Sequence, residues 1–213
     1  MMIVTMLALT VAEIVSPPCV PGYSQETLDY FRDVAMTPEM GQRYARPRRW
    51  SGQASVGVAG HPHEGDEEVI ATVMADLAPL VRPLVIDRDD ARPSITVHFV
   101  PRSEFRTLVP RYRGADFGLF RFSWDDAGAI ESALVLISDE LKEPDVRAHV
   151  IREELTQALG LPGDSRRYPE SIFYSEWTSV TEFSALDLEV IRLLYDTAIT
   201  DEQRMLATSC RGG

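Results

Sequence analysis

Hydrophobic and polar positions alternate along this chain in two different periods, which predict an interleaved order of helices and strands. Apolar residues spaced three and four apart predict helices at residues 24–36, 66–83, 103–108, 144–159, 184–195 and from 200 onward. Alternating or continuous apolar runs predict strands at residues 54–59, 84–86, 94–100, 117–124 and 130–138. The turn residues 125–128 read Asp-Asp-Ala-Gly, which favours a hairpin between the last two strands. We therefore expect an α+β fold.

The chain shows no internal repeat and no low-complexity linker, so we predict three segments. Residues 1–23 form a leader, residues 24–208 a single domain and residues 209–213 a tail. Residues 1–15 are almost wholly apolar, a length that suits the core of a secretory signal and is too short to span a bilayer. No Lys or Arg precedes this run, and no clear small-residue cleavage site follows it. We expect a secreted or cell-envelope protein without a stable transmembrane helix, with a buried N-terminal element as the alternative.

The charge balance restricts the possible partners. The 33 acidic and 21 basic residues give a formal net charge of −12, and nucleic-acid binding needs a concentrated basic face instead. The chain has one basic cluster, formed by Arg43, Arg46, Arg48 and Arg49. This cluster is either a local anion or lipid-headgroup site or a solvated loop whose arginines pair with surplus carboxylates, and composition favours the second.

The chain has two cysteines, which lie near its opposite ends. Cys19 and Cys210 form either one long-range disulfide, in an oxidising compartment, or two unrelated thiols. The sequence leaves both interpretations open.

The most informative stretch is the predicted helix that precedes Gly160, with its following loop. At about 100° per residue one half of its circumference is apolar and the other half polar. The apolar half holds Val150, Ile151, Leu155, Ala158 and Leu159, and the polar half holds Arg152, Glu153, Thr156 and Gln157. Glu154 falls within the apolar half, where a carboxylate needs a partner or a chemical role. The plain alternative is an amphipathic helix that ends on a glycine cap, with its acidic pair bonded to nearby backbone or arginine.

The spacing in this stretch is similar to the extended zinc-peptidase signature His-Glu-x-x-His-x-x-Gly-x-x-His. Glu153 stands in place of the first ligand histidine, and Glu154 stands at the general base. Gln157 replaces the second histidine, Gly160 matches the turn glycine, and Gly163 replaces the third histidine. Only the base and the turn of the signature are present.

The chemistry of these residue types argues against a resident cofactor. Zinc prefers at least three nitrogen, sulfur or carboxylate ligands, whereas Gln157 is a poor ligand and Gly163 offers none. Zinc or another divalent cation held by Glu153, Gln157 and Asp164 is the weaker alternative. His149, one turn before Glu153, is expected on the polar surface of the helix.

Three short segments of the sequence resemble one protein family more closely. REELTQALGL, YPESIFY and LDLEVIRLLYD resemble a bacterial family of envelope proteins and lipoproteins, domain-of-unknown-function family 2927. The resemblance covers residues 28–199 and is most specific at residues 151–174. It implies a zincin-like α+β fold with a mixed sheet, a backing helix, an active-site-type helix and C-terminal helices. It also implies a cell-envelope setting, but no reaction.

Three functional hypotheses follow. The first is a degenerate metallopeptidase that binds a peptide or envelope protein in the cleft between the sheet edge and the key helix, without cutting it. Tyr168 and Tyr174 are the candidate contacts, while Phe173 is expected in the core. The second is a hydrolase with an altered metal site, or with Glu154 as a metal-free general base. The third is a structural envelope protein without a ligand.

Overall fold

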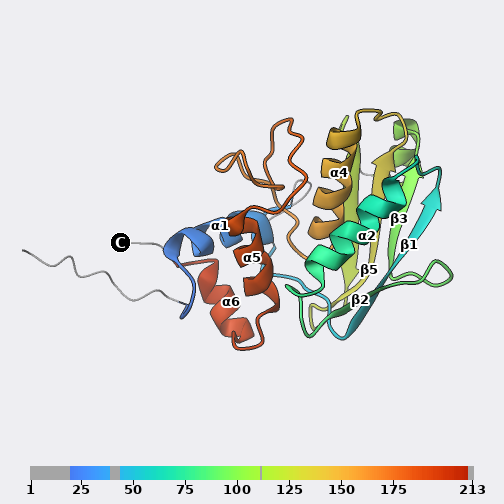
Figure 1. Cartoon of the computed structure of the whole chain (residues 1–213). Helices are drawn as coiled ribbons and strands as arrows, with labels where there is room; N and C mark the ends of the chain where they lie inside the picture. Colours follow the sequence, from blue (N-terminus) through green and yellow to red (C-terminus); the bar gives the residue numbers. More distant parts are fainter. Residues whose placement is uncertain (1–19, 39–43, 111, 211–213) are drawn as a thin grey trace, which may run out of the picture.

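A five-stranded mixed sheet, in the order β2-β1-β3-β5-β4, forms one side of the structure, with α1, α5 and α6 on the other (Figure 1). The computed structural model describes residues 20–38, 44–110 and 112–210. The strands are β1 Gln53–Gly60, β2 Val85–Arg88, β3 Ile95–Val100, β4 Gly118–Trp124 and β5 Ile130–Ser138. β1, β2, β3 and β5 run parallel, whereas β4 pairs antiparallel with β5 through the predicted hairpin. β2 and β4 are therefore the two edge strands.

In the described part of the chain six α-helices lie against this sheet or beside it, and three of them begin at the caps that the sequence predicts, Ser24, Ser184 and Thr200. They are α1 Gln25–Met36, α2 Asp66–Leu77, α3 Phe105–Leu108, α4 Pro144–Gln157, α5 Ala185–Tyr195 and α6 Asp201–Ala207, with a 3-10 turn at Arg102–Glu104. Ser184 with Asp187 and Thr200 with Gln203 form complete capping boxes. α2 ends at Leu77 rather than at residue 83, since the following apolar residues continue into the core from a turn.

Several sequence expectations concern parts of the chain outside the described residues. Most of the predicted leader, Cys19, Arg43 and the last three residues of the tail lie there. Cys210 lies within the described part and is disulfide-bonded. No helix in the described part is long and apolar enough to cross a bilayer.

Two hydrophobic clusters lie on opposite faces of the sheet. Ile95, Val97 and Phe99 project from β3 into the larger cluster, which α2, α4, α1 and α5 complete. The smaller cluster lies behind the sheet, where Phe105 of α3 packs with Leu119 of β4. In Figure 1, α2 and α4 lie across one face of the sheet, and α1, α5 and α6 gather beside it.

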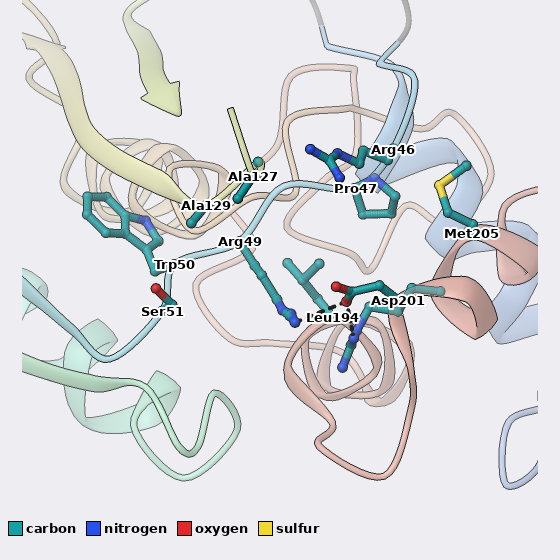
Figure 2. A pocket seen from close by; sticks show the side chains of 12 residues that line it. Arg46, Pro47, Arg49, Trp50, Ser51, Ala127, Ala129, Leu194, Asp201 and Met205 are labelled. Carbon is teal, nitrogen blue, oxygen red and sulfur yellow. Dashed lines mark hydrogen bonds and ion pairs between the residues drawn. The ribbon is translucent and has the colours of Figure 1, made fainter. Parts of the chain in front are cut away.

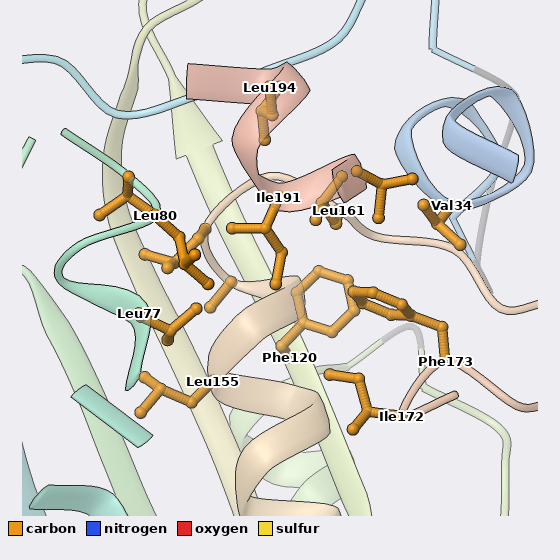
Figure 3. Close-up of a cluster of buried hydrophobic side chains, with 14 of the residues drawn as sticks. Val34, Leu77, Leu80, Phe120, Leu155, Leu161, Ile172, Phe173, Ile191 and Leu194 are labelled. Carbon is orange, nitrogen blue, oxygen red and sulfur yellow. The ribbon is translucent and has the colours of Figure 1, made fainter. Parts of the chain in front are cut away.

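α4 lies between the sheet and the other helices and is buried on nearly all sides. Leu155 of α4 belongs to the cluster that also holds Leu77 of α2, Ile191 of α5 and Phe173 of the following loop (Figure 3). The sequence predicts one exposed polar half for this helix, and that prediction is wrong. Arg152, Thr156 and Gln157 are buried, because α2 and residues 164–183 cover that side.

Two ion pairs join α4 to α2. Arg147 donates from Nε to Asp66 Oδ1 at 2.7 Å and from Nη2 to Asp66 Oδ2 at 2.6 Å, with both side chains almost fully buried. Arg152 lies 2.8 Å from Asp76 Oδ2, and its guanidinium stacks over the Phe183 ring. These pairs fix the position of α4 against the rest of the fold.

Candidate functional site

Glu154 is buried where α4 crosses β4. Its side chain lies against Gly118, the first residue of β4: a methyl group on Gly118 would come within 2.7 Å of Glu154 Cγ and 2.5 Å of Val150 Cγ1. The absence of a side chain at Gly118 therefore allows the helix and the edge strand to approach closely. The sequence expectation that Glu154 lies in the apolar half of the helix is confirmed.

A cavity of about 260 Å³ opens beside Glu154, between α4, the start of β4 and the loop that follows α4. Its lining includes five carboxylate residues and no Lys or Arg from the described residues. The five are Asp116, Glu153, Glu154, Asp164 and Glu176. The cavity wall is therefore rich in carboxylates, in a protein that is acidic as a whole, and one of them, Glu176, is paired with Arg166 at 3.1 Å.

His149 stands in the wall of this cavity and is held from both sides. Its Nδ1–H donates to the Val180 carbonyl at 2.7 Å, and Nε2 lies 3.3 Å from Glu153 Oε2. Burial by itself lowers the pKa of His149, but the hydrogen bond and charge of Glu153, with the Val180 carbonyl, outweigh burial and raise it. The expectation of a surface histidine is wrong, because the loop at Val180 folds back over α4.

The residues at the second and third ligand positions of the zinc-peptidase signature have other partners. Gln157 Nε2 donates to Asp164 Oδ1 at 2.7 Å, which ties the helix to the loop after it. The Gly163 N–H donates to the Val34 carbonyl at 2.8 Å. A methyl group on Gly163 would come within 2.6 Å of the Asp33 carbonyl oxygen, so position 163 faces the backbone of α1.

This arrangement does not fit a catalytic zinc. Glu153 is paired with His149, Gln157 uses its amide nitrogen on Asp164, and Gly163 faces away from the other two. The described residues contain no group of three or more His, Cys, Asp or Glu side chains arranged to hold a metal ion. We therefore derive no metal-dependent step from this site.

The aromatic residues of the loop separate into core, α1-facing and cavity-facing positions. Phe173 is buried in the core, as expected. Tyr174 lines the cavity, whereas Tyr168 donates to Glu26 at 2.9 Å and packs edge-on against α1, away from the cavity lining. Trp177, which no sequence pattern singles out, also lines the cavity and is 68% exposed. A single aromatic residue in a loop gives no periodic signal from which this position could be found.

The outer edge of β4 offers unpaired backbone groups beside the cavity. Ser138 N–H donates to the Phe117 carbonyl at 2.8 Å, which fixes the alternation of hydrogen bonds between β4 and β5. By that alternation the N–H and C=O groups of Gly118, Phe120 and Phe122 point away from β5. Within the described part of the chain no strand pairs with this side of β4.

The comparisons with known proteins address the family and the fold. A family model described as "Protein of unknown function (DUF2927)" matches residues 24–201. The chain belongs to this family. For this DUF2927 protein, no curated protein gives a match. Among solved structures it is similar to myroilysin, with 10% sequence identity, a TM-score of 0.45, and coverage of 70% of this chain and 95% of that chain. The family description names no reaction.

Proposed function

We propose that this DUF2927 protein is an exported binding module that holds an extended peptide or protein segment without cutting it. The observation that carries the proposal is the open edge of β4, whose outward backbone groups begin at Gly118 beside the acidic cavity. An added strand could hydrogen-bond along this edge while its side chains enter the space between β4 and α4.

The walls of the cavity indicate the chemistry of the segment. A wall rich in carboxylates favours a ligand with lysine or arginine side chains, and it accelerates the encounter of such a ligand with the site. Trp177 packs edge-on to Phe117 at 6.0 Å between ring centroids and leaves most of its surface exposed. This pair offers an apolar anchor next to the acidic wall.

Binding without cleavage is the simpler expectation from the side chains present. Glu153 is paired with His149 on the same helix, and Gln157 ties α4 to the loop through Asp164, so two of the three positions that hold zinc in the signature have other partners. Glu154 does line the cavity from the general-base position. Metal-free hydrolysis with Glu154 as the base is therefore the alternative that the experiment must separate.

The disulfide at Cys210 supports the exported location. Disulfides persist in oxidising compartments and are rare in reducing ones. Protein isolated from the medium or the cell envelope should show no thiol that reacts with an alkylating agent before reduction. A reactive thiol in that material would contradict this part of the proposal.

The binding proposal is tested with fluorescein-labelled extended peptides that carry lysine at alternate positions, beside matched peptides that carry glutamate. Fluorescence anisotropy should show saturable binding of the lysine series alone. Gly118→Ala and Trp177→Ala should each weaken binding, by roughly tenfold for loss of an aromatic anchor. Trp124→Ala, at the far end of the same strand, is the matched control and should bind as the wild type does.

Mass spectrometry of the same peptides separates binding from hydrolysis. Intact peptide after prolonged incubation supports the binding module. Cleavage that disappears in Glu154→Gln would show that the protein is a hydrolase and not a binding module. Absence of saturable binding in the lysine series would refute the proposal that the cleft binds a peptide.

A further inference from the structure

The arginine-rich loop before β1 differs from the sequence expectation that its arginines pair with carboxylates. Among the described residues only Arg49 of this loop forms such a pair. Arg46 donates to the backbone carbonyl of Asp126 at 3.1 Å, and Arg48 stacks over the Trp124 ring at 4.6 Å. The loop therefore keeps two guanidinium groups without a carboxylate partner in the described part of the chain.

This loop forms one wall of a pocket of about 240 Å³. The β4–β5 turn around Gly128 and the helices α5 and α6 form the rest of it, with Leu194 and Met205 as apolar lining. Figure 2 shows Arg49 reaching across the pocket towards Asp201, with Arg46 at the opposite side near the turn.

The centre of the pocket holds two arginines on one carboxylate oxygen. Arg49 Nη2 and Arg204 Nη1 both donate to Asp201 Oδ1, at 3.0 and 2.7 Å. The Arg204 side chain is only 5% exposed, and its Nε is buried without a hydrogen-bond partner among the described residues. The Asp201 side chain, by contrast, is 81% exposed and reaches the arginines from the solvent side.

The charges in the pocket do not balance. Among the residues that line the pocket, the guanidinium groups of Arg46, Arg49 and Arg204 face one carboxylate, that of Asp201, while Asp196, outside the lining, also acts on Arg204. This surplus occurs in a chain whose net charge is −12, where carboxylates for pairing are plentiful. Burial, and after it the charge of Arg49, lowers the pKa of Arg204, so the cation is under strain in the folded protein.

The turn at Gly128 brings the arginines still closer together. A methyl group on Gly128 would come within 2.5 Å of Arg48 Nη1 and 2.9 Å of Arg46 Nε. Both guanidinium groups therefore pack directly against Gly128. Burial, and after it the charge of Arg46, lowers the pKa of Arg48. Like charges that are held together gain when an anion binds between them.

We infer that this pocket binds a phosphate group on a small molecule or lipid headgroup, with Arg46, Arg49 and Arg204 as its donors. A phosphate carries about −1.5 to −2 charges at neutral pH, so it offsets more of the positive charge in the lining than a carboxylate does. Planar guanidinium groups donate two parallel hydrogen bonds to phosphate oxygens. In the free protein the exposed Asp201 carboxylate occupies the arginines and competes with the ligand.

Two probes distinguish the source of the phosphate. Soluble glycerol 3-phosphate is titrated into the full chain by calorimetry, and vesicles of phosphatidylcholine with phosphatidic acid are tested by co-sedimentation. Arg49→Gln and Arg46→Gln should each weaken binding in the responding arm by roughly ten- to a hundredfold. Arg121→Gln, an exposed arginine of β4 outside the pocket, is the matched control and should bind as the wild type does.

Asp201→Asn gives a result of opposite sign. Because it removes the competing carboxylate, this variant should bind the phosphate probe more tightly than the wild type, whereas a general loss of folding would weaken binding. Binding in either arm that depends on Arg49 supports the site and identifies the source. Failure of both arms, equal loss in Arg121→Gln, or weaker binding in Asp201→Asn would overturn the inference.

Discussion

The buried pair between Asp66 and Arg147 gives the sharpest prediction for stability. Arg147 donates to both carboxylate oxygens of Asp66 and also, from Nη1, to the Ser138 carbonyl at 2.6 Å and the Leu141 carbonyl at 3.1 Å. Asp66 in turn accepts the His63 N–H at 2.6 Å. Asp66→Ala leaves a buried guanidinium whose charge has no counterion among these contacts. Truncating one partner of a buried ion pair costs about 3–5 kcal/mol of unfolding free energy.

The neighbouring residue provides a matched control. Glu67 is also an acid in the first turn of α2, and it pairs with Arg88 at 3.1 Å, but its side chain is 61% exposed. Glu67→Ala should cost less than about 1 kcal/mol, as exposed ion pairs do. Both variants lose a negative charge at the same helix terminus, so the effect of the helix dipole largely cancels between them.

Urea unfolding followed by circular dichroism measures both free energies. Asp66→Ala should shift the midpoint strongly and lower the melting temperature by roughly 6–20 °C, at 2–4 °C per kcal/mol for a domain of this size. The double change Asp66→Leu with Arg147→Met should recover much of the loss, because it removes the unpaired charge and keeps the volume. A cost for Asp66→Ala no larger than that for Glu67→Ala would refute the reasoning.

Two further predictions concern the loop and the helix that form the cavity. Gly163→Ala should lower the unfolding free energy by about 1–3 kcal/mol in urea titrations, because its methyl group meets the backbone oxygens of Asp33 in α1 and of Thr37 at the C-cap of α1. Unchanged stability would contradict the packing. The pKa of His149 is higher in the folded protein than its unfolded value of 6.5. The pairing of His149 with Glu153 therefore stabilises the fold fully below pH 6.5, and this stabilisation is lost as the pH rises through the folded pKa. Unfolding free energies at about pH 6 and pH 9 should show this loss in the wild type and a smaller one in Glu153→Gln; equal slopes would contradict it.

Local signals in the sequence predicted most of the elements of this fold. The capping residues Ser184 and Thr200 mark helix starts that depend only on residues three positions away. The hairpin at residues 125–128 likewise follows from turn chemistry, and the buried face of β3 from simple alternation. The predicted end of α2 was wrong, because Leu80 continues the apolar pattern although the chain has already left the helix.

The sequence predicts the positions of site residues correctly only where those positions depend on neighbours within the same helix or strand. The helical wheel placed Glu154 correctly, because its neighbours on α4 and the sheet define one apolar face. It misplaced Arg152 and His149, because their partners Asp76 and Val180 come from segments distant in the sequence. A buried polar residue with a distant partner has the same local pattern as an exposed one.

The same distant contacts explain why histidines at the signature positions would not rebuild a zinc site. Gln157 holds Asp164, and the Gly163 N–H holds α1, so both positions fasten the loop that forms the second wall of the cavity. A histidine at position 163 would collide with the backbone of α1 before it could turn towards position 153. The helix and the loop therefore act as a structural support for the cleft beside β4, which is the part of the molecule where we place binding.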